Sequence, residues 1–207
     1  MTRSMNGRPL PLDSPQMTAI VTYLKFLSTG QRVGAPTFGR GPGRMVELTR
    51  AADSIRGKVV YTQTCAACHG GNGGGQRTGR VGDAGGYIVP PLWGDDSFND
   101  GAGMDRLISA ANFIHNNMPV GTTRQQPVLS VEDSRDVAAF VLSQPRPQKA
   151  HLDRDFPVRT EKPAEAAYGP YIDGFSREQH TLGPFLPIEK KLAALKAANP
   201  DHIPGRN

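Results

Sequence analysis

Two cysteines followed directly by a histidine place the strongest constraint on how this chain folds. Cys65 and Cys68 are the only cysteines among its 207 residues, and His69 follows Cys68. Each thiol can add across a vinyl group of haem to form a thioether, and the adjacent histidine can then give a ring nitrogen to the iron. The motif therefore predicts a fold built around one covalently attached haem c, with His69 as an iron ligand.

Three other uses of a Cys-x-x-Cys pair compete with haem. Two cysteines cannot make a three- or four-thiolate zinc site within one chain, and no histidine pair has zinc-finger spacing. A thioredoxin-like dithiol would open a helix in a βαβ pattern, whereas this motif closes a predicted helix and runs into glycines. A disulfide across two residues is sterically awkward and leaves His69 without a role. Haem remains the favoured prediction.

The second axial ligand of the iron is expected between residues 114 and 119. Met118 is our predicted ligand, because Pro119 follows it and restricts the backbone there. His115 is the alternative, and it would give a bis-histidine iron of lower potential. Packing in the core is the common role of a methionine. An iron held by histidine and methionine has no open position, so it suits electron transfer better than oxygen binding.

The sequence around the motif predicts helices that would enclose a haem. Asp53 to Cys65 reads as one helix, with Gly57 and Tyr61 on the same face. A second helix begins at Ser130, with Asp133 at the capping-box position, and ends before Pro145. Glycine lets another helix cross closely, and we expect Phe140 of the second helix to meet Gly57 and Tyr61.

A further helix is predicted from Gly103 to Ile114, leading into the methionine segment. Its apolar residues recur at helical spacing, while Asp105 and Arg106 are expected to point outward. Before it, the glycines of residues 70–86 lack the spacing of a nucleotide-binding loop and are expected to skirt the haem edge. The carbonyl of Pro90 is expected to accept a hydrogen bond from the free ring N–H of His69.

Taken together, residues 54–145 resemble a class I cytochrome c domain, which implies a small all-α bundle around haem. The matching positions are Cys65, Cys68 and His69 for the haem motif, Pro90-Pro91-Leu92 for the loop beside the proximal histidine, and Met118-Pro119 for the distal ligand. The resemblance implies that Pro90 and Leu92 contribute to the cofactor site and that His69 and Met118 hold the iron.

The chain is also similar to dihaem thiosulfate dehydrogenases outside this domain. Residues 3–11 and the following helix are similar to the closing half of their first haem domain. The tail matches theirs at Tyr168-Gly169-Pro170-Tyr171 and at Gly183-Pro184-Phe185. The first haem motif and the cysteine ligand of the catalytic haem have no counterpart before residue 3. We therefore expect an N-terminally truncated relative that retains the electron-accepting haem.

One further position bears on ligation in that family. Some members carry a lysine just before the distal methionine, where it can act as an alternative ligand. The corresponding residue here is Asn117. An exchange of ligands of that kind is therefore not expected.

These observations divide the chain into four parts. Residues 1–30 are expected to be a single-helix remnant of a first cytochrome c domain, residues 31–53 a linker, residues 54–145 the haem domain, and residues 146–207 an irregular extension. The remnant helix should begin after Ser14 and stop at Gly30. In the extension a short helix over Glu189 to Ala198 competes with disorder beyond Pro187.

Charge and hydropathy bear on partners and location. The net charge of +5 is spread along the chain, so nucleic acid is not an expected partner. Positive potential would steer an acidic redox protein or a small anionic sulfur compound, through Arg3, Arg8, Arg40 and Arg44. Neither a signal peptide nor a transmembrane stretch is found, yet haem attachment outside the cytoplasmic membrane makes a periplasmic location the expectation.

Three functions follow from these patterns. The first is a single-haem cytochrome that carries one electron at a time, in oxidation of sulfur compounds, with no catalytic residue of its own. The second is the electron-relay part of a thiosulfate dehydrogenase, so whether the chain acts as an enzyme stays open. The third is a fragment that never acquires haem, whose uncovered apolar face at residues 1–30 would favour association.

Overall fold

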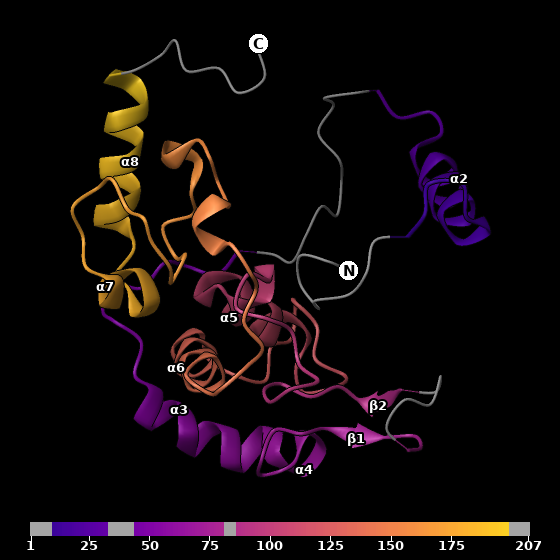
Figure 1. Cartoon of the computed structure of the whole chain (residues 1–207). Helices are drawn as coiled ribbons and strands as arrows, with labels where there is room; N and C mark the ends of the chain where they lie inside the picture. The colour runs from indigo at the N-terminus through magenta and orange to yellow at the C-terminus, as the bar shows by residue number, and fades with distance from the viewer. Residues whose placement is uncertain (1–9, 33–43, 81–85, 199–207) are drawn as a thin grey trace.

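The structure is a computed structural model that describes residues 10–32, 44–80 and 86–198, and this part of the chain is mainly helical (Figure 1). The helices are α2 (Pro15–Ser28), α3 (Ser54–Val60), α4 (Ala66–His69), α5 (Leu107–Asn117), α6 (Val131–Leu142), α7 (Arg177–Leu182) and α8 (Leu186–Ala198). A π-helical turn, η1 (Tyr61–Cys65), joins α3 to α4, and 3-10 turns form at η2 (Gly103–Asp105), η3 (Leu152–Arg154) and η4 (Arg159–Glu161). The predicted helical fold is confirmed. A short antiparallel pair, β1 (Gln76–Arg77) and β2 (Tyr87–Val89), was not predicted.

Helices α3 and α6 cross in close contact at Gly57. A Cβ atom at this position would lie 1.8 Å from the carbonyl oxygen of Asp136 and 3.0 Å from Cβ of Phe140. The rings of Tyr61 and Phe140 also meet, with their centroids 5.3 Å apart. The partnership of Phe140 with Gly57 and Tyr61 is therefore confirmed.

The starts of both crossing helices are fixed by side-chain caps. The Asp53 carboxylate accepts hydrogen bonds from the backbone N–H groups of Ile55 and Arg56. The Ser130 hydroxyl accepts one from the N–H of Asp133 at 3.0 Å. These caps satisfy N–H groups that have no partner within the helix. Both predicted helix starts are confirmed.

The outward orientation predicted for Asp105 is wrong. Its side chain is only 12% exposed, and Oδ1 lies 3.0 Å from Nε of Arg146. Burial raises the pKa of Asp105 to about 7, while the Arg146 charge opposes that rise. Helical spacing could not reveal this arrangement, because the segment that covers Asp105 lies about forty residues further along the chain.

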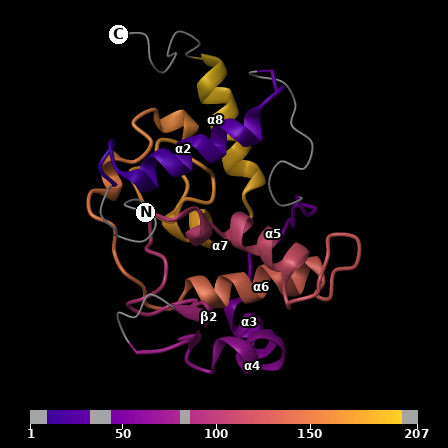
Figure 2. The same cartoon turned by 90° about the vertical axis from the view of Figure 1, so that its right-hand side faces the viewer.

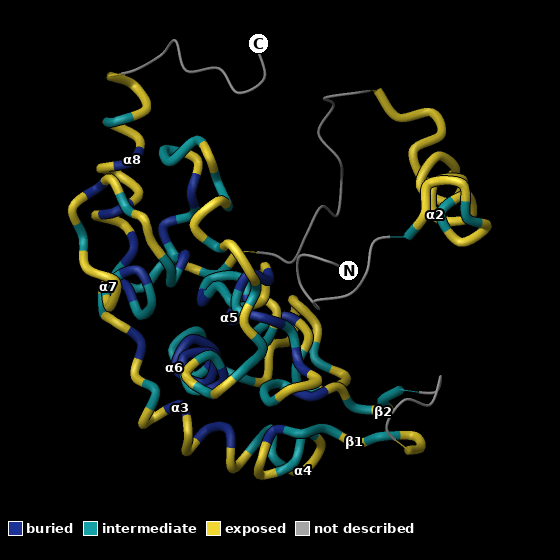
Figure 3. The backbone as a smooth tube through the Cα atoms, in the orientation of Figure 1, coloured by how far each residue is buried: buried dark blue, intermediate teal, exposed yellow. Residues whose placement is uncertain are grey.

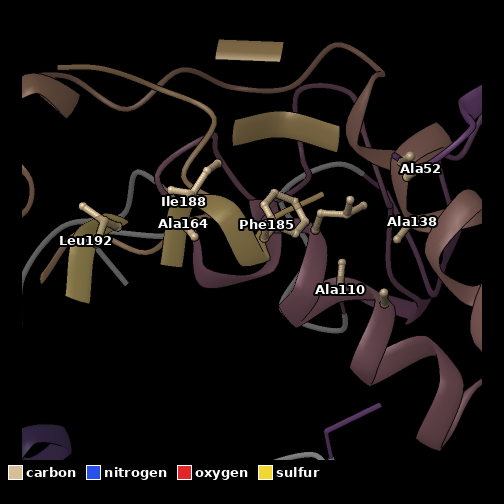
Figure 4. Packing of buried hydrophobic residues seen from close by; sticks show 10 residues of the cluster. Ala52, Ala110, Ala138, Ala164, Phe185, Ile188 and Leu192 are labelled. Atoms are coloured by element: carbon tan, nitrogen blue, oxygen red, sulfur yellow. The ribbon is translucent and has the colours of Figure 1, made fainter. Parts of the chain in front are cut away.

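The tail adds a second layer to the helical core. Phe185 and Ile188 are fully buried in one apolar cluster with Leu107, Ala111 and Ala138. Figure 4 shows the labelled side chains from α5, α6 and α8 gathering around Phe185. The expected tail helix is present as α8, although it begins at Leu186 rather than Glu189. The disorder alternative is wrong for the tail as far as residue 198.

Residues 44–53, the described end of the segment expected to be a linker, lie against the same core. The backbone N–H of Met45 donates to Oδ1 of Asn112 at 2.7 Å. Arg50 makes two hydrogen bonds of 2.8 Å to the buried carboxylate of Asp136, which raise the pKa of Arg50. The N–H of Ala52 donates to the carbonyl of Leu182 in α7. Residues 33–43 lie outside the described part of the chain.

Helix α2 lies apart from the other helices (Figure 1), and Figure 2 gives a second view of it. Ser14 caps its start as predicted, and it ends at Ser28, two residues before Gly30. None of its residues is buried, and Tyr23, Phe26 and Leu27 are exposed (Figure 3). No helix within residues 10–32, 44–80 and 86–198 is long and apolar enough to cross a bilayer.

Replacing Gly57 with alanine should destabilise the protein, since the new methyl group would collide with the backbone of α6. We expect Gly57→Ala to lower the free energy of unfolding by about 3 kcal/mol. Gly71→Ala is the matched control, because a Cβ there meets nothing within 4 Å. Denaturant unfolding of the haem-loaded protein measures both. Equal midpoints for the two variants would contradict the close crossing.

Truncating Phe185 should show whether the tail belongs to the core. Phe185→Ala removes a fully buried ring and should cost about 3–5 kcal/mol of unfolding free energy. Leu186→Ala, at a neighbouring position that is 44% exposed, should cost far less. Thermal unfolding of both variants provides the comparison, and a wild-type melting temperature for Phe185→Ala would show that the tail does not dock.

Candidate haem site

The two cysteines lie at the end of the π-helical turn and in the short helix that follows it. Cys65 closes η1, and Cys68 and His69 belong to α4. Both cysteines are free thiols, so the disulfide alternative is not seen. Burial raises the pKa of the Cys65 thiol to about 11, with the neighbouring Cys68 adding to the rise. The Cys65 thiol is therefore protonated at neutral pH.

The ring of His69 is oriented by a backbone carbonyl. Its Nδ1 lies 3.0 Å from the carbonyl oxygen of Pro90, which is the contact expected from the sequence. A carbonyl can only accept, so Nδ1 carries the proton and Nε2 keeps a lone pair. An imidazole held in this way is ready to bind a metal through Nε2.

Two backbone hydrogen bonds brace this contact from the glycine-rich loop. The N–H of Gly75 donates to the carbonyl of His69 at 2.9 Å, and the N–H of Leu92 donates to the carbonyl of Gly73 at 2.8 Å. Gly75 has φ +71°, and a Cβ there would lie 2.2 Å from the carbonyl oxygen of Val89. Glycine is needed at this position because the two loop backbones touch.

Three aromatic rings form a platform beside the motif. Tyr61 lies 5.1 Å from Trp93 and 5.3 Å from Phe140, and Trp93 meets Phe140 edge-on at 5.8 Å between centroids. The Tyr61 hydroxyl donates to the carbonyl of Gly70, directly after His69, at 2.6 Å. Burial raises the pKa of Tyr61 to about 12. This phenol therefore stays protonated and acts as a donor.

The sequence did not reveal the contact between Trp93 and the glycine-rich loop. A Cβ at Gly73 would lie 2.2 Å from the indole ring. Gly73 also has φ +64°, so both its space and its backbone conformation favour glycine. The sequence does show a tryptophan after Pro90-Pro91-Leu92. It does not show which of the several glycines in residues 70–86 this tryptophan contacts.

Met118 follows α5 directly and opens the loop that leads to α6. Its N–H donates to the carbonyl of Ile114 at 2.9 Å, which continues the helical pattern by one residue. Its side chain is half-buried. The side chain of Asn117 donates to the carbonyl of Phe113 at 3.0 Å.

The ring of His115, the alternative distal ligand, is also held by contacts at Nδ1. Its Nδ1 lies 3.0 Å from the carbonyl oxygen of Leu129 and 3.5 Å from the hydroxyl of Ser134. The ring thus ties α5 to the end of the loop that carries Met118. This contact uses Nδ1, the same ring nitrogen that His69 places on Pro90, so the choice between Met118 and His115 as distal ligand stays a prediction.

The apolar residues around the motif suit a large flat apolar group. Val60, Tyr61, Val137 and Val141 are buried together behind the motif. The apolar side chains that pack on them remain partly accessible, and they include Cys65, Ala66, Leu92, Ile114 and Leu129. Two free thiols, a fixed imidazole, a thioether and this apolar surface make a donor set that fits a covalently bound haem.

The arginines expected to steer anionic partners are mostly beyond the described ranges. Arg3, Arg8 and Arg40 lie outside the described residues. Arg44 is described, and it is exposed. Their role in steering stays a prediction.

Comparison with known proteins agrees with this geometry. Residues 54–145 match the family model described as Cytochrome c. The chain is 44% identical over 145 residues to the thiosulfate dehydrogenase of Allochromatium vinosum, which covers 70% of this chain and 51% of that protein. It is 40% identical over 176 residues to the thiosulfate dehydrogenase of Stutzerimonas stutzeri, and this match covers 83% of this chain and 55% of that protein. The chain thus spans about half the length of these relatives.

A solved structure gives a similar result. The thiosulfate dehydrogenase (TsdBA) from Marichromatium purpuratum superposes with a TM-score of 0.57 at 36% sequence identity. The match covers 72% of this chain and 30% of that one.

Removing the Tyr61 hydroxyl should destabilise the backbone directly after His69, because the hydroxyl donates to the Gly70 carbonyl. Tyr61→Phe leaves the Gly70 carbonyl without its buried donor, and we expect a loss of about 1 kcal/mol in unfolding free energy. Tyr23→Phe, on the exposed α2, is the matched control and should change nothing. Urea unfolding of the haem-loaded protein measures both variants. An unchanged midpoint for Tyr61→Phe would show that the hydrogen bond to Gly70 does not stabilise the fold.

Proposed function

Residues 54–145 form a domain of the cytochrome c family, and on that basis we propose that this chain transfers single electrons through one covalent haem c in sulfur-compound oxidation. The observation that carries the proposal is the fixed ring of His69, with Nδ1 on the Pro90 carbonyl and Nε2 available, next to two free thiols. When bound, haem supplies an iron that gains or loses one electron.

Each residue of the site has a distinct role in this proposal. Cys65 and Cys68 would anchor the porphyrin through thioethers, and His69 and Met118 would hold the iron. Pro90 fixes the His69 ring through its carbonyl. Leu92 adds to the apolar wall of the site.

The chain's residues also set the conditions for electron transfer. Leu92, Ile114 and Leu129, which pack on the buried cluster behind the motif, would supply an apolar surface that limits the access of water to a bound haem. A thioether ligand favours the reduced iron, and two protein ligands leave no position open for oxygen. His115 acts in the apoprotein as a structural residue, by tying α5 to the loop end at Leu129.

Location and partners follow from the same chemistry. A cytochrome c exchanges electrons with a redox partner. We propose an acidic protein as that partner, since the chain has a net charge of +5, with an anionic sulfur compound as a further candidate. We propose a periplasmic location, where thioether attachment of haem takes place.

The second candidate is the electron-relay part of a thiosulfate dehydrogenase. It is favoured by the identity of 40–44% to thiosulfate dehydrogenases, over alignments longer than the 54–145 segment. In this proposal the thiosulfate-oxidising centre lies outside the residues of this chain. Thiosulfate alone should then leave the oxidised visible spectrum of the haem-loaded chain unchanged. Formation of tetrathionate by the chain by itself would overturn the relay assignment.

The proposed cofactor is tested by expression behind a secretion signal together with a haem-maturation system. The denatured wild-type protein should have the mass of the chain plus one haem, and the double variant Cys65→Ala/Cys68→Ala should have the apo mass. A wild-type protein with the apo mass would overturn the proposal and favour a fragment that cannot acquire haem.

The distal ligand is tested by two substitutions in the same segment. Met118→Ala should lose the weak red sulfur-to-iron band of the oxidised spectrum, bind cyanide readily and lower the potential. His115→Ala should keep that band and lose about 1 kcal/mol of unfolding free energy, because the Leu129 carbonyl loses its donor. Loss of the band in His115→Ala alone would move the ligand to His115.

A further inference from the structure

The hydroxyl of Thr122 is buried and has no partner among residues 10–32, 44–80 and 86–198. Its Oγ1 is inaccessible to solvent, and no hydrogen bond to it is made by any of the residues described. Thr122 lies in the loop that begins at Met118, and its N–H donates to the carbonyl of Pro119 at 3.0 Å. A tight turn therefore holds this hydroxyl close in sequence to the proposed distal ligand.

An orphan hydroxyl of this kind needs an explanation. A buried hydroxyl without a partner costs about 1–3 kcal/mol, and buried polar atoms nearly always have one. The next residue behaves in the ordinary way, since Thr123 is exposed and its Oγ1 accepts a hydrogen bond from the N–H of Gln126 at 3.2 Å. The missing partner of Thr122 is therefore expected to be a group other than the residues that the structure describes.

The chemistry of haem narrows the choice of partner. A haem held by two thioethers presents methyl groups, thioether carbons and two propionates at its rim. The propionate carboxylates are the only hydrogen-bond acceptors among these. The sulfur of Met118 makes no hydrogen bond with this hydroxyl, and in the proposed function its lone pair is committed to iron.

We propose that the Thr122 hydroxyl donates a hydrogen bond to a haem propionate and so positions the Met118 loop over the cofactor. This assignment rests on the proposed function, since it requires a haem bound by residues 54–145. A donor on the carboxylate draws negative charge away from the iron. Thr122 is therefore a positioning residue that also raises the reduction potential.

The test compares three haem-loaded variants with the wild-type protein. Thr122→Val keeps the shape of the side chain without its hydroxyl, Thr122→Ser keeps the hydroxyl, and Thr123→Val removes an exposed hydroxyl from the same loop. Mass and the sulfur-to-iron band establish haem attachment and ligation. Resonance Raman spectra then report the propionate bending band, whose frequency rises with hydrogen bonding to the carboxylate. Equilibration with a redox mediator reports the ratio of reduced to oxidised protein.

We expect Thr122→Val to retain one haem, to lower the propionate bending frequency and to reduce the reduced-to-oxidised ratio by roughly threefold. Thr122→Ser and Thr123→Val should match the wild-type protein in both measurements. If Thr122→Val does not accumulate, Thr122→Ala is compared with Thr122→Ser instead. This pair also isolates the hydroxyl, because serine retains it and alanine does not.

Several outcomes would overturn the assignment. A wild-type Raman band and ratio in Thr122→Val would show that the partner is not a haem propionate, while the haem function would stand. Loss of the sulfur-to-iron band with an unchanged propionate band would show that the hydroxyl acts on Met118 instead. A wild-type protein without haem would overturn the proposed function itself, and this assignment with it.

Discussion

The buried carboxylate of Asp136 holds together the part of the fold on which the site depends. It is fully buried in α6 and accepts hydrogen bonds from Arg50 and from the N–H of Asp53, the residue that caps α3. Its backbone carbonyl faces Gly57 across the helix crossing. One residue thus connects α6, the start of α3 and the segment before it. A buried carboxylate is costly without such partners, so these contacts hold the three elements together.

The geometry of the motif follows from this crossing. Because α3 is held against α6, the next turn places Tyr61 against both Trp93 and Phe140. The Tyr61 hydroxyl then reaches the carbonyl of Gly70, directly after His69. The loop containing Trp93 also carries the Pro90 carbonyl that orients His69. The structure therefore already orients the residues of the proximal half of the proposed haem site. The distal half depends on a longer loop, which α5 and His115 tie down at Leu129.

Local signals in the sequence predicted much of this arrangement. Caps at Asp53 and Ser130 and the glycine at position 57 act within a few residues or on one helix face, so their patterns predicted helix starts and a crossing. The burial of Asp105 and the docking of Phe185 depend on segments tens of residues away, and no local pattern encodes those partners. The candidate site divides in the same way: the His69 contact was expected, whereas the Trp93 platform required the fold.

The acceptor of the His69 hydrogen bond has an electronic consequence. Pro90 offers a neutral carbonyl, where a carboxylate would draw the ring proton more strongly and give the imidazole imidazolate character. An imidazolate-like ligand donates more charge and stabilises ferric iron, as suits proteins that activate peroxide. A neutral acceptor leaves the ring a weaker donor, so a proline backbone at this position biases the proposed centre toward taking up an electron and keeping it until an acceptor arrives.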